Sequence, residues 1–325
     1  MNNNKLDIAV YGLTKNYRGS SNGLNGLNME VPRGKVHGLL GPNGAGKTTT
    51  VKILSTLLEA DAGEAYVSGY NVSTQAREVR ERIGLVGQYA ALDEILTGRQ
   101  NLVMFGRLSR LSPRQARKRA DDLLEWFGLA GSGNMPVGKY SGGMRRRLDL
   151  AASLIVSPSV LFVDEPTTGL DPLGRKEVWG AIRSLADEGA TVLLTTQYLE
   201  EADLLADRIS ILKEGRIIAE GTADELKSVY GGDRLEITMS GEADTRKAVE
   251  TIAKVIPAKP FVDEASHRIH VPVNNRTEAL LKAAAALSEA RLDPVDIAVR
   301  RPSLDEVFID LTGSPAVSTQ NKGAI

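Results

Sequence analysis

The chain of 325 residues lacks cysteine, long apolar runs and an excess of charge of either sign. Without cysteine it can form no disulfide and use no thiolate chemistry, which fits a reducing compartment. Its longest apolar stretches, such as residues 154–163, are interrupted by serine and proline and fall short of the roughly 20 residues that span a bilayer. The first residues lack the charged and apolar regions of a secretion signal. We therefore expect any membrane role to depend on a partner protein.

The charges are balanced, with 40 basic and 41 acidic side chains and a formal net charge of -1. Because no global field attracts nucleic acid or anionic lipid, we expect no nucleic-acid partner. Hydrophobic residues make up 42% and charged residues 25%, which is ordinary for a soluble globular protein. The length favours two compact units, one large and one small.

A glycine-rich loop at residues 41–50 gives the strongest functional signal. Its sequence, GPNGAGKTTT, follows the apolar run 36–40 and precedes apolar residues at helical spacing, which predicts a strand, a loop and a helix. The loop fits the phosphate-binding pattern at every fixed position. Its glycines permit backbone conformations that turn successive N–H groups toward a phosphate chain, and the helix adds its positive end. The alternative is a plain glycine-rich turn.

Each part of this loop has an expected role in holding a nucleoside triphosphate. Lys47 would reach the β- and γ-phosphates, and the hydroxyl of Thr48 would ligate a magnesium ion that bridges them. The residues expected to bind nucleotide here are Gly41, Asn43, Gly44, Ala45, Gly46, Lys47, Thr48 and Thr49.

Two later strands are predicted to end at the same site. The apolar run 160–163 leads into Asp164 and Glu165, and acids at the carboxyl edge of a parallel sheet lie where open α/β folds bind ligands. We expect Asp164 to hold the magnesium shell and Glu165 to accept a proton from, or orient, the attacking water. The strand 83–87 leads to Gln88, whose amide suits contact with magnesium or a water, although a glutamine there is usually just part of a turn.

A helical insert is predicted at about residues 92–154, between two halves of the nucleotide domain. It contains a capping box at residues 112–115, with proline at the first helical position. At its far end Ser141 is a good N-cap, and Gly142 and Gly143 would let a phosphate approach the helix closely. A plain capped helix after a glycine-rich loop is the alternative.

The flanking segments complete the predicted nucleotide domain. Residues 6–31 alternate as short antiparallel strands do, and Tyr17 at a strand end would stack on an adenine ring or else pack locally. The buried strand 190–196 ends at Gln197, and residues 209–219 form a predicted closing hairpin.

Taken together, these motifs resemble the ATP-binding cassette family over about two-thirds of the chain. The matching motifs are the loop GPNGAGKT, the Gln88 segment, SGGM at 141–144, LFVDEP at 161–166 and GLDP at 169–172, in the family's order. The resemblance implies an α/β fold with a P-loop, RecA-like core, an antiparallel β subdomain and the helical insert. It also implies ATP hydrolysis, with ATP and Mg²⁺ as cofactors.

The resemblance further implies a head-to-tail homodimer in the ATP-bound state, with two sites by symmetry. ATP would lie between the phosphate loop of one copy and Ser141, Gly142 and Gly143 of the other, and Asp171 of GLDP would join the site. Lys47, Glu165 and Gln197 would be the catalytic residues. Gln197 departs from the family pattern, because most members have a histidine there. A glutamine can donate through its amide but carries no titratable proton, which leaves the rate of hydrolysis open.

A narrower resemblance points to the daunorubicin-resistance branch of exporters. It is carried by RRRLDLA at 145–151, TTQYLEEAD at 195–203 and the closing RPSLDEVFIDLTG at 301–313. From residue 235 the pattern is β-α-β-β-α-β, which predicts a small α+β ferredoxin-like domain. The expected domains are an ATP-binding domain at 1–231, the ferredoxin-like domain at 232–313 and an unstructured tail at 314–325.

The expected function is that of an ATP-hydrolysing motor subunit of a drug or antibiotic exporter. The subunit would lie at the cytoplasmic face of the membrane, bound peripherally to an integral membrane permease. One alternative is a cassette that transports nothing and acts as an ATP-driven clamp on ribosomes or DNA. Others are an exporter of lipid or polymer and a small-molecule phosphotransferase, which would leave the segment 141–143 unexplained.

Overall fold

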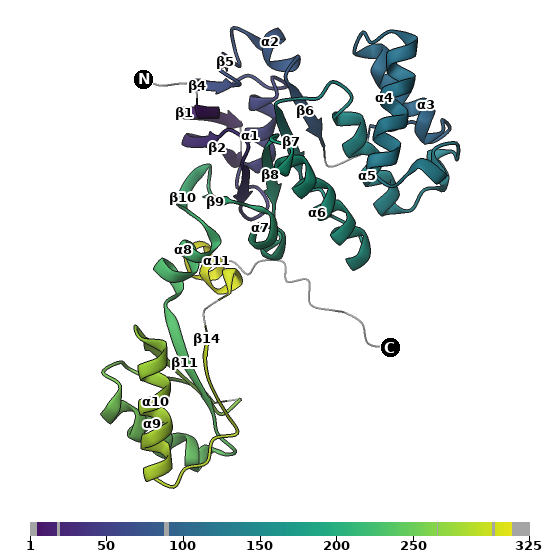
Figure 1. The fold of residues 1–325 in the computed structure, drawn as a ribbon. Coiled ribbons are helices and arrows are strands. Elements are labelled where there is room, and N and C mark those ends of the chain that lie inside the picture. Colours follow the sequence, from purple (N-terminus) through teal and green to yellow (C-terminus); the bar gives the residue numbers. More distant parts are fainter. Residues whose placement is uncertain (1–4, 18–19, 88–90, 265, 301–302, 314–325) are drawn as a thin grey trace. The chain divides into compact units, whose positions relative to one another are not determined.

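The computed structural model describes residues 5–17, 20–87, 91–264, 266–300 and 303–313. The described residues up to Thr222 form one compact unit, and those from Ala223 form a second (Figure 1). The domain bounds expected from the sequence, 1–231 and 232–313, stay a prediction, because contacts within each unit do not test whether it folds independently. No described helix is both long and apolar enough to cross a bilayer.

The first unit is built on a six-stranded sheet in the order β10-β9-β3-β8-β7-β6. Its strands are β3 (Val36–Leu40), β6 (Ile83–Val86), β7 (Val160–Asp164), β8 (Thr191–Thr196), β9 (Arg208–Lys213) and β10 (Arg216–Gly221). All neighbours pair in parallel except β9 and β10, which form the predicted hairpin. Every residue of β3, β7 and β8 is buried, as expected for parallel strands covered on both faces.

A second sheet of this unit is antiparallel and has the order β2-β1-β4-β5. Its strands are β1 (Leu6–Tyr17), β2 (Ser20–Pro32), β4 (Ala62–Val67) and β5 (Tyr70–Asn71). The apolar residues of β1 and β2 alternate inward and join one core with α1 (Lys47–Leu54) and with Leu39, Phe162 and Leu193 of the parallel sheet. This sheet confirms the antiparallel strands predicted for residues 6–31.

Helices cover the parallel sheet and form the insert (Figure 1). They are α2 (Ala76–Arg80), α3 (Gly98–Leu108), α4 (Pro113–Trp126), α5 (Gly142–Ser153), α6 (Pro172–Asp187) and α7 (Leu199–Leu205), with 3₁₀ turns at Ala130–Ser132 and Val137–Lys139. The capping box predicted for α4 is confirmed, because Ser112 Oγ accepts from Gln115 N at 3.3 Å and Gln115 Oε1 accepts from Ser112 N at 2.9 Å. The insert becomes helical only at Gly98, later than predicted, because Thr97 caps α3.

The second unit confirms the predicted ferredoxin-like pattern. Its elements are β11 (Asp233–Thr238), α9 (Glu242–Val255), β12 (Phe261–Asp263), β13 (Arg268–Val273), α10 (Arg276–Glu289) and β14 (Asp296–Arg300). The antiparallel sheet order is β12-β13-β11-β14, and side chains of α9 and α10 complete its core. The short helix α8 (Ala223–Leu226) and a π-helical turn (Lys227–Gly231) pack with α11 (Leu304–Thr312), which Ser303 caps.

Candidate active site

The glycine-rich loop connects β3 to α1, as predicted. Gly44 and Gly46 have φ values of 82° and 111°, in the region that favours glycine. Gly41 does not adopt such a φ, so our expectation that it supplies backbone freedom is wrong. It is required for space instead, because a Cβ there would lie 2.5 Å from the carbonyl oxygen of Leu212 in β9. The loop can therefore pass close to β9 only if residue 41 has no side chain.

Lys47 is the first residue of α1 and is buried, with 5% exposure. Its Nζ donates to the carbonyl oxygens of Gly41 at 2.7 Å and Pro42 at 3.2 Å, and lies 3.6 Å from Glu165 Oε1. Burial lowers the pKa of Lys47, while the carboxylates of Glu165 and Asp164 act to raise it. The ammonium group is thus held inside the loop, beside the carboxylate of Glu165.

The two acids predicted after β7 lie together at the carboxyl edge of the sheet. Asp164 is 5% exposed and accepts hydrogen bonds from Thr195 Oγ1 in β8 and, at 3.5 Å, from Thr48 Oγ1. Glu165 has a φ of 46°, unusual for a residue with a side chain, and its N–H donates to the carbonyl oxygen of Thr195 at 3.0 Å. The hydroxyl of Thr48 and the carboxylate of Asp164 therefore face each other.

A cavity of about 370 Å³ joins the ends of β3, β7 and β8. Its lining residues are Asn43, Gly44, Gly46, Lys47, Thr48, Thr49, Glu165, Thr168 and Gln197. The loop, Glu165 and Gln197 thus share one hollow, as parallel strands that end at the same edge require. Thr168 was missed by the sequence reasoning, although its place shortly after the two acids was a usable signal.

The oxygen donors fit a magnesium ion that shares its ligands with a phosphate chain. Mg²⁺ keeps several waters and binds through one or two carboxylates plus phosphate oxygens. Thr48 and Asp164 offer such a partial set. Among the described residues no group of three or more His, Cys, Asp or Glu side chains could hold a metal alone. Thr48 and Asp164 would leave the other ligand positions of such an ion to water and phosphate oxygens.

The second predicted anion site lies at the N-terminus of α5, outside that cavity. Ser141 caps α5 by accepting from Met144 N at 3.2 Å, and Ser141 and Gly142 are exposed. Gly143 packs against α6, because a Cβ on it would lie 3.3 Å from the Cα of Gly174. This end of α5 is open to a ligand, but it does not line the cavity that contains Lys47 of the same chain.

The remaining predicted site residues fall into three cases. Asp171 caps α6 by accepting from Gly174 N at 3.0 Å and does not line the cavity. Tyr17, the last residue of β1, is 38% exposed and does not line it either. Gln88 lies outside the described residues. The structure thus brings together the residues at the ends of three strands, and leaves Asp171 and Tyr17 apart from them.

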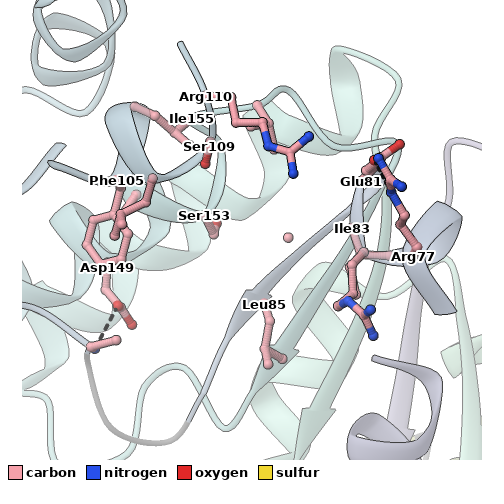
Figure 2. Close-up of a pocket in the computed structure, with 16 residues that line it drawn as sticks. Arg77, Glu81, Ile83, Leu85, Phe105, Ser109, Arg110, Asp149, Ser153 and Ile155 are labelled. Atoms are coloured by element: carbon pink, nitrogen blue, oxygen red, sulfur yellow. Dashed lines mark hydrogen bonds and ion pairs between the residues drawn. The ribbon is translucent and has the colours of Figure 1, made fainter. Parts of the chain in front are cut away.

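A larger hollow of about 1000 Å³ lies between β6 and the helical insert. Figure 2 shows Ile83 and Leu85 of β6 on one side, and Phe105, Asp149 and Ile155 on the other. The arginines that line it are Arg77, Arg80 and Arg110, and its apolar residues include Leu85, Phe105, Leu108, Ile155 and Val156. We call this hollow the insert groove.

Comparison with known proteins places these sites in a family. Residues 24–168 match the ABC transporter family, and residues 221–312 match the family described as ATP-binding protein DrrA1-3-like, C-terminal domain. A daunorubicin resistance ATP-binding protein of Streptomyces coeruleorubidus is 55% identical over 317 residues, 98% of this chain and 98% of that protein. A doxorubicin resistance ATP-binding protein of Mycobacterium tuberculosis is 48% identical over 321 residues, 98% of this chain and 97% of that protein.

A solved structure of similar fold is an ATP-binding cassette in a dimeric, post-hydrolysis state bound to ADP and Pi. Its TM-score is 0.59 at 26% identity, and the match covers 66% of this chain and 98% of that one. Identity of 55% along nearly the whole chain shows that it belongs to the ABC transporter family, as an ATP-binding and ATP-hydrolysing subunit with a DrrA-like C-terminal domain.

Proposed function

We propose that this chain is the motor subunit of an exporter, in which ATP hydrolysis drives efflux of a drug or antibiotic through a separate membrane permease. Support comes from identity along nearly the whole chain with proteins named for daunorubicin and doxorubicin resistance. The same matches favour an exporter over a clamp on ribosomes or DNA. The subunit would lie at the cytoplasmic face of the membrane, bound to the permease.

Within one protomer, each cavity residue would have a separate role in hydrolysis. Lys47 would exchange its contacts with Gly41 and Pro42 for phosphate oxygens. Glu165 would accept a proton from the attacking water, and Gln197 would donate its amide to the γ-phosphate. Magnesium, when bound, neutralises charge on the β- and γ-phosphates, and Thr48 and Asp164 would hold it.

The active site would be completed by a second copy of the chain. One observation carries this proposal: the N-terminus of α5, with Ser141 and Gly142, is exposed and does not line the cavity that holds Lys47. A helix N-terminus stabilises a nearby anion, so an anionic ligand at this end of α5 would make a favourable interaction. A head-to-tail dimer would place this helix end on the γ-phosphate held by the lysine of the partner, twice by symmetry.

Complementation between two inactive variants tests this arrangement. Lys47→Ala removes the lysine, Ser141→Arg blocks the helix end, and each homodimer should be inactive. In an equal mixture half of the dimers are mixed, and each keeps one intact site, so about a quarter of the wild-type turnover should return. Ser112→Arg, the same change at the N-cap of α4, controls for loss of capping. A mixture as inactive as its components would refute the shared site.

The permease would contact the insert groove. Its lining includes apolar side chains, among them Leu108 of α3, which is 72% exposed. Three arginines line it against two carboxylates, those of Glu81 and Asp149. These features suit an amphipathic segment that carries carboxylates, because it would bury apolar surface and pair with the arginines. The groove is formed by β6 and the insert, so its occupant would contact both parts of the ATP-binding domain.

A further inference from the structure

The side chain of Arg146, in the second turn of α5, is buried among the backbone ends of two parallel strands. It is 7% exposed. Its Nη1 donates to the carbonyl oxygen of Gly87 at 2.7 Å, just beyond β6. Its Nε donates to that of Pro166 at 2.8 Å, and its Nη2 to that of Asp164 at 3.1 Å. One guanidinium therefore fixes three carbonyl oxygens that follow or end β6 and β7.

The neighbouring carboxylate of Asp149 offsets part of the cost of burying the charge of Arg146. Asp149 Oδ2 lies 3.3 Å from Arg146 Nη1, and its Oδ1 accepts from Ala91 N at 3.3 Å. Burial raises the pKa of Asp149 to about 6, while the arginine acts to lower it. The pair thus connects α5 to the chain on both sides of the segment 88–90, and Asp149 also lines the insert groove.

The segment held by Arg146 also has a buried contact with α7. Thr167 Oγ1 and Trp179 Nε1 each donate at 3.0 Å to Oε1 of Glu201, a carboxylate in α7 with 0% exposure. The residues from Asp164 to Thr167 therefore have little freedom to move, although they connect a strand to a loop. This is the segment that carries the two acids of the cavity.

We propose that Arg146 is a positioning residue for ATP hydrolysis, which sets the backbone that presents Asp164 and Glu165 and ties that backbone to α5. The inference rests on the roles proposed above for those two acids. Because Ser141 lies at the start of the same helix, any shift of α5 as its N-terminus meets a nucleotide would be transmitted to the carbonyl oxygens of Asp164 and Pro166. A lysine cannot replace this contact, since a single ammonium cannot match three donors fixed in one plane.

The decisive measurement is the steady-state ATPase of Arg146→Lys. A displacement of about 1 Å at a reacting group costs up to about a hundredfold in rate, so we expect kcat to fall by about ten- to a hundredfold, with KM for ATP within about threefold of wild type. Arg145→Lys is the matched control, because Arg145 is partly exposed and pairs with Glu94 at 2.8 Å. Asp149→Asn keeps the arginine but removes its counter-charge, and should lower kcat less.

A second measurement asks whether Arg146 acts through Glu165. If it does, adding Arg146→Lys to Glu165→Gln should lower the residual turnover by less than about twofold, because the group to be positioned is already gone. Wild-type kcat in Arg146→Lys, or a fall in melting temperature alone, would overturn the positioning role while leaving the site assignment intact. Wild-type turnover in Glu165→Gln would instead overturn the assignment on which the inference rests.

Discussion

Replacing Glu165 by glutamine isolates the proton-accepting role that we assign to its carboxylate. Glutamine has the same shape and keeps an acceptor oxygen near Lys47 Nζ, which lies 3.6 Å from Glu165 Oε1 in the native protein. It cannot take a proton from water at neutral pH. The lysine, Thr48 and the glycine-rich loop are unchanged, so the variant should still bind the triphosphate.

The size of the effect follows from this separation of binding and chemistry. Loss of a general base costs about 10²- to 10⁴-fold in rate, which corresponds to about 2.7–5.4 kcal/mol of transition-state stabilisation. The loss should appear in kcat, with KM for ATP within a few-fold of wild type. Because hydrolysis is what would release the dimer, the variant should also accumulate as an ATP-bound dimer.

Two assays on the purified chain with ATP and magnesium measure these quantities. Phosphate release at varied ATP gives kcat and KM, and size-exclusion chromatography with multi-angle scattering gives the oligomeric state. Glu200→Gln is the matched control, since Glu200 is exposed on α7 and does not line the cavity. A kcat within threefold of wild type would refute the assignment of the base, and a monomer with bound ATP would refute the dimer.

Two further predictions concern other parts of the first unit. Leu108→Glu places a charge at an apolar position of the insert groove that is 72% exposed, so co-purification of the permease should be lost, whereas undiminished recovery would exclude this docking site. Burial lowers the pKa of His37 from 6.5 to about 4. Between pH 6.5 and pH 4 the unfolded chain therefore binds more protons than the folded chain does. As the pH drops through this range, the free energy of unfolding should fall by up to about 3 kcal/mol. Denaturation of wild type and His37→Gln from pH 4.5 to 7.5 should show this difference, and parallel profiles would contradict it.

Most cavity residues could be found from the sequence because they follow an apolar strand, directly or through the glycine-rich loop, although Thr168 was missed. Lys47, Glu165 and Gln197 follow β3, β7 and β8, and neighbouring parallel strands present their carboxyl ends at one edge. The local sequence pattern at each strand end therefore predicted that residues far apart in the sequence lie close together. Asp171 and Ser141 are also named by their motifs, but each only caps a helix in this chain, because what completes their site would be a second chain.

The role of Arg146 could not be predicted, because it is the middle of three consecutive arginines. Successive residues of an α-helix point about 100° apart, so the three side chains lie on different faces. Arg145 pairs with Glu94 and Arg147 with Glu177, while Arg146 points into the protein. Which of the three faces inward depends on how α5 packs against β6 and β7, and identical residue types carry no information on that choice.

The backbone conformation of Glu165 could not be predicted from the sequence either. A left-handed φ of 46° costs about 1–3 kcal/mol in a residue with a side chain, so surrounding contacts must maintain it. Thr195 supplies them from β8, because its carbonyl oxygen accepts the N–H of Glu165 at 3.0 Å and its hydroxyl binds the carboxylate of Asp164. The motif names the two acids, but their presentation to the cavity depends on a threonine thirty residues later. A change at Thr195 would therefore disturb both acids at once, although Thr195 lies outside the LFVDEP motif that contains them.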